Sequence, residues 1–301
     1  MTSTVSLPVL VWTLTTAALI VWILFRPKQR APWQILAMIA VFALEPFSAM
    51  IMNAENRAIP LKYDHFLQAL DQALGISAFS VAHLLTPWAG QLFVLYQSLS
   101  FAMIAWYAWQ LLAKNGKPRH LVYAYLLAYC LGPCLYLIVP ACGPRHAYPG
   151  MFPVQLPNLE LTLVPLRYWP NAMPSLHLTT ALILLMLARN TWMRLVGSLY
   201  VAGTVLATLA FEHYVIDLIV AFPFAAFATA LARQRYYHAG VQACVLLAWL
   251  FLIRLATPFL VAHTDGLRLA ALVTVFLHPL FSWDGWSKRF FQLPAGRLRP
   301  T

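Results

Sequence analysis

Uninterrupted apolar runs of about 20 residues recur along this chain of 301 residues. At about 1.5 Å per residue, a helical run of that length crosses a bilayer core of roughly 30 Å. Hydrophobic residues make up 61% of the sequence and charged residues 10%, whereas a soluble domain has about 45–50% and about 25%. We therefore expect an all-α fold, a polytopic bundle of transmembrane helices, and exclude a water-soluble enzyme.

The apolar runs and their flanking residues predict about nine membrane spans. Their expected bounds are 6–25, 33–52, 90–113, 121–141, 176–190, 195–212, 213–232, 240–261 and 268–284. The first run has no basic segment before it and no small-residue cleavage site after it. We interpret it as a retained helix rather than a signal peptide.

Basic residues predict the orientation, because they concentrate in cytoplasmic loops. Fourteen of the 20 Lys and Arg residues fall in one set of loops, which places the N-terminus outside and the C-terminus inside. These loops account for the excess of 20 basic over 9 acidic residues, and we expect no nucleic-acid partner. The four cysteines show only a CxxxC grouping inside a span, which favours neither a disulfide nor a zinc site.

Two outer stretches, 53–80 and 142–175, are too polar to be spans. The first contains a pattern of one apolar and one polar helical face. The apolar face holds Phe66, Leu67, Leu70 and Leu74, and the polar face holds Asp64, His65 and Asp71. We interpret this segment as a short helix in the membrane interface, with a role in gripping the substrate as the alternative.

Three polar groups fall at the outer ends of spans, where polar side chains are costly and often functional. They are GPRHAYP at 143–149, NAMPSLH at 171–177 and EHYVID at 212–217. The predicted topology places all three on the same side of the membrane, although their chemistry was not used to derive it. We therefore expect one site built from these groups.

The residue types in these groups suit phosphoryl transfer. His213 and Asp217 are four residues apart, so one helical turn places them on the same face, where the carboxylate can orient the imidazole as a nucleophile. Ser175 can cap the helix that begins after it, which leaves His177 on the first turn as a proton donor. The guanidinium of Arg145 matches phosphate oxygens.

Each residue also has a plainer interpretation. A lone histidine at a helix end is often an interfacial residue, and Arg145 alone could meet lipid headgroups. His177, His213 and Asp217 could instead hold iron or zinc. We expect no metal and no cofactor, because no further Glu or His lies at ligand spacing in the spans.

PSLH followed about 36 residues later by HYVID resembles the type 2 phosphatidic acid phosphatase superfamily over residues 120–235. The resemblance implies a catalytic core of six helices. It implies that His213 attacks phosphorus to form a phosphohistidine, that Asp217 orients His213, and that His177 protonates the leaving oxygen, without a metal.

The sequence departs from the common phosphatase pattern, whose motifs read KxxxxxxRP, PSGH and SRxxxxxH. Ile138 replaces the lysine, Leu176 replaces the glycine, and Ala207 replaces the arginine. HYVIDLIVA resembles instead the branch of inositol phosphorylceramide synthases and sphingomyelin synthases, and KYDHFLQALDQALG is similar to a segment before the core of bacterial relatives.

The departures from the pattern reduce the number of expected phosphate-binding residues. Arg145 is the expected surviving clamp, with Ser175, Arg167 and Lys62 as further phosphate-binding residues. We expect an N-terminal part over 1–80, the catalytic core over 81–235, and C-terminal spans with a basic tail over 236–301.

The expected function is transfer of a phospholipid headgroup at the extracytoplasmic face. The partners are a membrane lipid substrate and a lipid hydroxyl acceptor, with no protein partner. A periplasm-facing site in a bacterial inner membrane is favoured over a lumenal site in a Golgi-type membrane.

Three alternatives stay open. Water as the acceptor would make a lipid phosphatase. Glu45 and Arg254, which are charged and lie inside spans, would suit a lipid transporter, although a structural ion pair between them explains both. A noncatalytic membrane subunit is the third alternative.

Overall fold

The computed structural model describes residues 58–112, 116–155, 160–166, 168 and 172–282. It confirms the helical fold class. The helices are α3 (Asp64–Leu74), α4 (Ala78–Leu85), η1 (Thr86–Trp88), α5 (Ala89–Gln97), α6 (Leu99–Leu112), α7 (Pro118–Tyr136), α8 (Pro144–Ala147), α9 (Leu176–Met186), α10 (Thr191–Phe211), α11 (Val215–Ala232), α12 (Tyr236–Ala262) and α13 (Thr264–Ser282). The strands β1 (Leu61–Lys62) and β2 (Val164–Pro165) pair antiparallel.

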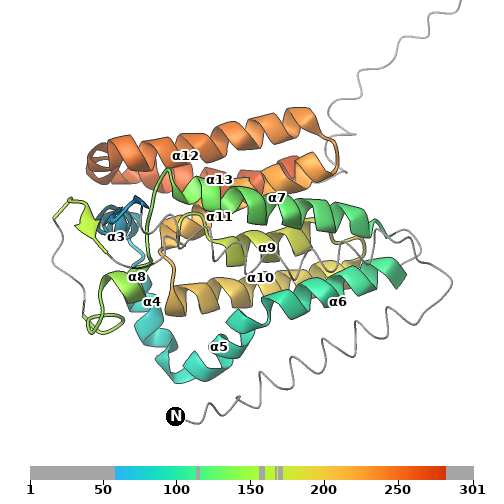
Figure 1. Cartoon of the computed structure of the whole chain (residues 1–301), viewed down its shortest axis with the longest axis horizontal. Helices are drawn as coiled ribbons and strands as arrows, with labels where there is room; N and C mark the ends of the chain where they lie inside the picture. The colour runs from blue at the N-terminus through green and yellow to red at the C-terminus, as the bar shows by residue number, and fades with distance from the viewer. Residues whose placement is uncertain (1–57, 113–115, 156–159, 167, 169–171, 283–301) are drawn as a thin grey trace, which may run out of the picture.

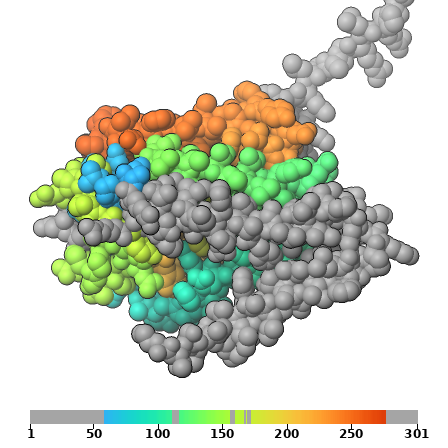
Figure 2. Space-filling model, viewed as in Figure 1, coloured from blue at the N-terminus to red at the C-terminus, as the bar shows by residue number. Residues whose placement is uncertain are grey.

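The long helices run side by side, and the short elements gather at one end of the bundle (Figure 1). Helices α9, α10 and α11 lie in the middle, the pair α12 and α13 covers one side, and α4, α5 and α6 lie on the other. The space-filling view shows α3 (blue) beside the segment around residue 150 (yellow-green) at that same end (Figure 2). We call this the site end.

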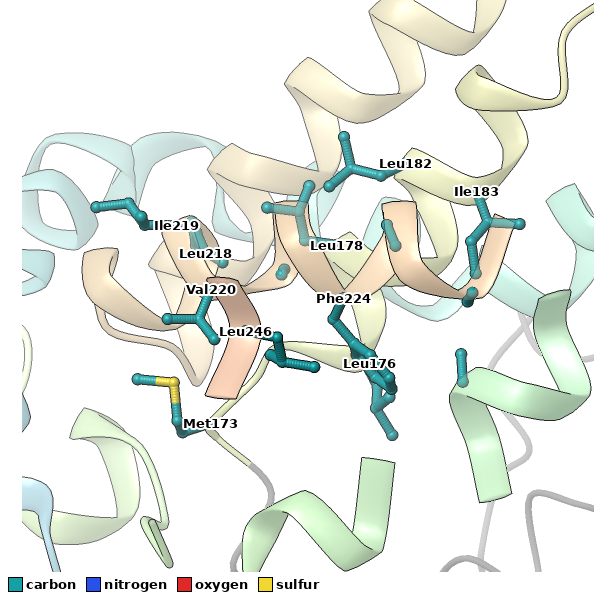
Figure 3. Close-up of a cluster of buried hydrophobic side chains, with 14 of the residues drawn as sticks. Met173, Leu176, Leu178, Leu182, Ile183, Leu218, Ile219, Val220, Phe224 and Leu246 are labelled. Atoms are coloured by element: carbon teal, nitrogen blue, oxygen red, sulfur yellow. The ribbon is translucent and has the colours of Figure 1, made fainter. Parts of the chain in front are cut away.

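Helix α11 forms the centre of the core. It is apolar on all sides, which is the pattern of a helix buried all round, and it packs against α7, α9, α12 and α13. Figure 3 shows Leu178 and Leu182 of α9 beside Leu218 and Phe224 of α11, all buried. This packing fixes the start of α9 relative to the start of α11, where the predicted histidines lie.

Four helical segments of the described chain are long and apolar enough to cross a membrane: Ala78–Gln97, α10, α11 and α12. Helix α9 is apolar but shorter. The chain is therefore an integral membrane protein. The predicted spans 6–25 and 33–52 lie outside the described residues, so the count of nine stays a prediction, as does the division at residues 80 and 235.

The predicted span 90–113 is divided in the structure. Helix α5 ends at Gln97 and α6 begins at Leu99, and the two helices meet at an angle (Figure 1). The hydroxyl of Ser98 donates to the carbonyl oxygen of Leu95 at 2.7 Å. Such a bond from serine back to the helix backbone competes with regular helical geometry and often bends helices, which an apolar run does not reveal.

Helix α3 exists as predicted, but its polar face is not turned to water. Asp64 and Asp71 are both fully buried. The carboxylates face protein at the site end, because α3 packs against α8, α11 and α12. The interpretation of α3 as a plain interfacial helix is therefore wrong for this face.

Arg254 of α12 donates to the backbone carbonyl oxygens of Leu137 and Ile138, at 3.3 Å and 2.6 Å. These carbonyls follow the end of α7, so the guanidinium supplies donors to backbone acceptors that the helix leaves without partners. Glu45, its predicted partner, lies outside the described residues.

Candidate active site

His213 lies in the turn between α10 and α11, with its side chain buried. Its Nδ1 atom is 3.1 Å from the carbonyl oxygen of Ala172 and 3.5 Å from Oδ2 of Asp217. A carbonyl oxygen only accepts, so Nδ1 carries the hydrogen and Nε2 keeps its lone pair. This tautomer suits attack of Nε2 on phosphorus.

Asp217 relates to His213 differently from the prediction. Helix α11 begins at Val215, so His213 precedes the helix instead of sharing a face with Asp217. Oδ2 of Asp217 accepts the backbone N–H of Tyr214 at 2.8 Å and closes a capping box. The carbonyl of Ala172 is thus the nearer acceptor for His213, and a backbone carbonyl gives no signal in a sequence.

Burial controls the charge of His213, the predicted nucleophile. It lowers the pKa of His213 to about 4, although the charge of Glu212 and the carbonyl of Ala172 both act to raise it. The imidazole is therefore neutral near pH 7, which is the form that can attack phosphorus.

His177 occupies the first turn of α9, as predicted. Its ring stacks on Tyr96 of α5 at a centroid distance of 3.9 Å and lies 6.3 Å from the ring of His213. The two imidazoles are close enough to contact one phosphoryl group from different sides. The structure therefore brings together the predicted nucleophile and the predicted proton donor.

Ser175 caps α9, as predicted. Its hydroxyl accepts the backbone N–H of Leu178 at 3.3 Å, and its own N–H donates to the carbonyl oxygen of Asp217 at 3.4 Å. The second bond ties the starts of α9 and α11 together. Contact between Ser175 and a phosphate stays a prediction.

Arg145 lies in the short helix α8 with an exposed side chain. Gly143, which precedes α8, has a φ of +86°, and a Cβ there would meet the carbonyl oxygen of Glu212 at 1.8 Å. Only glycine permits this approach. The segment of Arg145 therefore packs directly on the backbone next to His213, as an anion clamp requires.

Lys62 and Arg167 are the two other basic residues that were predicted to bind phosphate. Lys62 is fully buried in β1, and its ammonium group donates to the carbonyl oxygen of Ile59. Contact between Lys62 and a phosphate stays a prediction. Arg167 lies outside the described residues.

The site also contains a group of aromatic and acidic residues around Glu212 that the sequence analysis did not predict. The hydroxyl of Tyr96 donates to Oε2 of Glu212 at 2.8 Å, and Nε2 of His146 lies 3.7 Å from Oε1. The ring of His146 stacks on Tyr168 at 3.5 Å. Glu212 is adjacent to His213 in the chain, whereas Tyr96 lies in an apolar run without any signal.

Glu212 is ionised at neutral pH. Burial acts to raise its pKa, but His146 and the hydroxyl of Tyr96 outweigh that effect and lower the pKa to about 2. A fixed negative charge therefore lies beside His213, the predicted nucleophile.

A family model described as the PAP2 superfamily matches residues 65–231, more than half of the chain. The chain belongs to the PAP2 superfamily. No curated protein and no solved structure matches it. Membership in the PAP2 superfamily supports lipid phosphoryl chemistry of the phosphatase or phosphotransferase kind.

The PAP2 match begins inside α3, and α3 is built into the site. Oδ1 of Asp64 accepts the backbone N–H of Gly143 at 2.9 Å and the hydroxyl of Tyr214 at 3.0 Å, and both carboxylate oxygens are 3.1 Å from the N–H of Cys142. Burial raises the pKa of Asp64 to about 7 against these hydrogen bonds. Asp64 therefore joins the segment before Arg145 to the residue after His213.

Asp71, also in α3, binds the start of α11 next to His213. Its two carboxylate oxygens accept the backbone N–H groups of Val215 at 2.9 Å and Ile216 at 3.0 Å. These are the first two residues of α11, whose N–H groups have no partner inside the helix. Asp71 thus caps α11 from another helix, and α3 positions both loops of the site.

In the part of the chain that the structure describes, no group of three or more His, Cys, Asp or Glu side chains could hold a metal ion. The arrangement offers a neutral imidazole, that of His213, a second imidazole and a guanidinium. These groups match acid, base and anion-binding roles in phosphoryl transfer. Independence from metal stays a prediction.

Proposed function

We propose that this protein transfers a phosphate-linked headgroup from a phosphodiester lipid to the hydroxyl of a second lipid, in the manner of inositol phosphorylceramide and sphingomyelin synthases. The observation that carries the proposal is the pair of His213 and His177, with ring centroids 6.3 Å apart, beside the ionised carboxylate of Glu212. The site geometry supports the two-step chemistry, and the charge balance supports the kind of donor.

In the first step, Nε2 of neutral His213 attacks phosphorus, the bond from phosphorus to the diacylglycerol oxygen breaks, and the imidazolium form of His177 donates a proton to that oxygen and becomes neutral. In the second step, an acceptor hydroxyl attacks the phosphohistidine and gives its proton to His177. The bond from phosphorus to nitrogen then breaks, which restores neutral His213.

The charges near His213 favour a donor with little negative charge. A phosphodiester carries one negative charge, whereas a phosphate monoester carries about 1.5 to 2 at pH 7. Ala207 is buried in α10 where the phosphatase pattern has an arginine, and Glu212 adds a carboxylate. One exposed guanidinium, that of Arg145, suits one charge better than two. Arg167 is proposed as an additional clamp.

We place the site at the extracytoplasmic face, on the distribution of basic residues. A bacterial inner membrane, with the site facing the periplasm, is the proposed location. The donor and the acceptor both reside in the membrane, so neither has to leave the bilayer to reach the site end.

The test is one incubation of purified protein in detergent with radiolabelled lipids and a metal chelator. The panel contains phosphodiester lipids and lipid phosphate monoesters, each with and without diacylglycerol or ceramide. We expect a new labelled phospholipid only when a phosphodiester donor and an acceptor are both present. Free phosphate released from a monoester without an acceptor would establish a phosphatase and overturn the transferase proposal.

Two variants control this test. His213→Ala should abolish the product. His263→Ala removes an exposed histidine at the end of α12 and should leave turnover unchanged. If His213→Ala forms as much product as the wild type, the proposed chemistry is wrong. If no lipid in the panel turns over while radiolabelled lipid crosses vesicle membranes, the transporter alternative replaces it.

A further inference from the structure

The start of α7, the end of α11 and the start of α12 lie at the end of the bundle away from the site end (Figure 1). They form a cavity of about 580 Å³. Helix α11 has 18 residues, which at 1.5 Å per residue separates the cavity from His213 by about 27 Å. The cavity is therefore separate from the catalytic site.

Positive charge concentrates around this cavity. Arg119 and Arg233 line it, together with His120. The charges of Lys117 and Arg189 also act on the His120 ring. The acidic residues that the structure describes all lie elsewhere, on α3, α11, α13 and the loops of the site end: Asp64, Asp71, Glu160, Glu212, Asp217 and Asp265.

Two polar groups in the cavity are arranged to hold a ligand. Nδ1 of His120 is buried and has no hydrogen-bond partner in the described part of the chain. Nη2 of Arg233 donates to the carbonyl oxygen of Met186 at 2.8 Å, which fixes the guanidinium while using one of its five N–H groups. A fixed guanidinium next to an unpaired imidazole suits an anion with several oxygen atoms.

An apolar stripe leads out of the cavity along α7. Tyr123, Leu126, Leu127 and Cys130 line the cavity wall at spacings of three, four and seven residues, so they share one face of the helix. Tyr123 is 53% exposed, and Cys130 is exposed as well. From Tyr123 to Cys130 the stripe is about 10 Å long, at 1.5 Å per residue. An apolar surface of this length suits a hydrocarbon chain and not a free inorganic anion.

We propose that this cavity binds an anionic phospholipid of the leaflet opposite the catalytic site. The lipid phosphate contacts Arg119, Arg233 and His120, and one acyl chain follows the stripe on α7. The lipid phosphate neutralises positive charge that the described acidic residues do not balance. The bound lipid also contacts α7, α11 and α12 together, at the end of the bundle away from the site end. This binding does not depend on the catalytic proposal.

The experiment is native mass spectrometry of the full-length protein in detergent. It uses phosphatidylglycerol, phosphatidylcholine and inorganic phosphate as separate probes, and a melting curve with each probe provides a second readout. We expect retained phosphatidylglycerol, weaker phosphatidylcholine, no retained inorganic phosphate, and a higher melting temperature only with phosphatidylglycerol. Equal retention of both lipids, or retention and stabilisation by inorganic phosphate alone, would overturn the proposal.

Variants separate a built site from general attraction to a basic surface. Arg119→Gln combined with Arg233→Gln should weaken phosphatidylglycerol binding about fivefold for each arginine removed. Arg194→Gln in α10 removes one positive charge outside the cavity and is the matched control. Equal weakening by Arg194→Gln and by Arg119→Gln alone would show that surface charge explains the binding and would contradict the proposal.

Folding of the variants is checked by their elution from a size-exclusion column. Arg119→Gln alters an exposed side chain, so it serves alone if the double variant does not fold. Leu127→Asp places a charge on the stripe and should weaken phosphatidylglycerol binding without changing the cationic part of the cavity. Unchanged binding in both Arg119→Gln and Leu127→Asp would exclude this site.

Discussion

The carboxylate of Asp71 accepts the backbone N–H of Val215 at 2.9 Å, although 144 residues separate the two in the chain. The bond caps the helix that follows His213, the proposed nucleophile. The turn that contains His213 is therefore held from outside by α3, which contributes no group to the proposed chemistry.

Asp71→Ala should destabilise the protein and inactivate it. Its removal leaves the N–H groups of Val215 and Ile216 without their acceptors, at a cost of about 1–3 kcal/mol for each buried group. Thermal melting in detergent and headgroup transfer measure the two effects. Asp265→Ala, which alters an exposed side chain, is the matched control. Wild-type melting and activity in Asp71→Ala would contradict the capping role.

Gly143→Ala should reduce activity strongly. The added Cβ would lie 1.8 Å from the carbonyl oxygen of Glu212, so the segment of Arg145 or the turn of His213 has to move. Gly150→Ala is the matched control, because Gly150 also has a positive φ, +82°, but a Cβ there meets nothing within 4 Å. Initial rates at saturating donor compare the two variants. Equal losses would show that backbone strain alone, about 1–2 kcal/mol, explains the effect.

Several features of the site were predictable from residue type and spacing, and others were not. His213 and His177 lie together because their motifs end or begin apolar helices on one side of the predicted topology, and the segment of Arg145 reaches them through the close approach of Gly143 to Glu212. Glu212 and Tyr96 join them through contacts between distant helices, which no single segment encodes.

The burial of Asp64 and Asp71 could not be predicted from the sequence. On a helical wheel they form an ordinary polar face, and their partners are backbone N–H groups, which every residue except proline has. The full burial of Lys62 was likewise not predicted, because nothing in the sequence around this lysine signals it.

Tyr96→Phe should lower activity by about tenfold. It removes the 2.8 Å hydrogen bond to Glu212 but keeps the ring that stacks on His177, and a hydrogen bond to a charged group contributes about 1.5–3 kcal/mol. Tyr96→Leu should cost more, because it also removes the stacking. Measurement of kcat and KM for both variants separates the two contacts. Identical losses in the two variants would show that the hydroxyl alone matters, and an unchanged rate in Tyr96→Phe would show that the ring alone does.

The low-pH limb of the rate of phosphoenzyme formation should have its midpoint near 4, where His213 becomes protonated. Neutral His213 is the reactive form and its pKa is about 4, below the ordinary 6.5. Glu212, with a pKa of about 2, keeps its charge through that range. Rapid-quench measurements between pH 3 and pH 8, values bracketing both the shifted and the ordinary histidine pKa, test this. A midpoint near 6.5 would contradict the burial of His213 in the active protein.

The same pKa affects stability with a defined sign. A histidine whose pKa is lower in the folded protein binds fewer protons than the unfolded chain between about 4 and 6.5. The contribution of His213 to the free energy of unfolding is therefore fully present above pH 6.5 and is lost as the pH falls toward 4. The slope of melting temperature against pH should be smaller in His213→Gln, and an unchanged slope would assign the effect to another group.

The most direct measurement is to trap the covalent intermediate with a donor labelled at phosphorus. Protein is mixed with the labelled phosphodiester without acceptor, quenched in base, digested and mapped by mass spectrometry. We expect label on the peptide that contains His213, sensitivity of that label to acid, its loss on addition of the lipid acceptor, and no label in His213→Ala. Label on another residue, or turnover in His213→Ala, would contradict the assignment of His213 as the nucleophile.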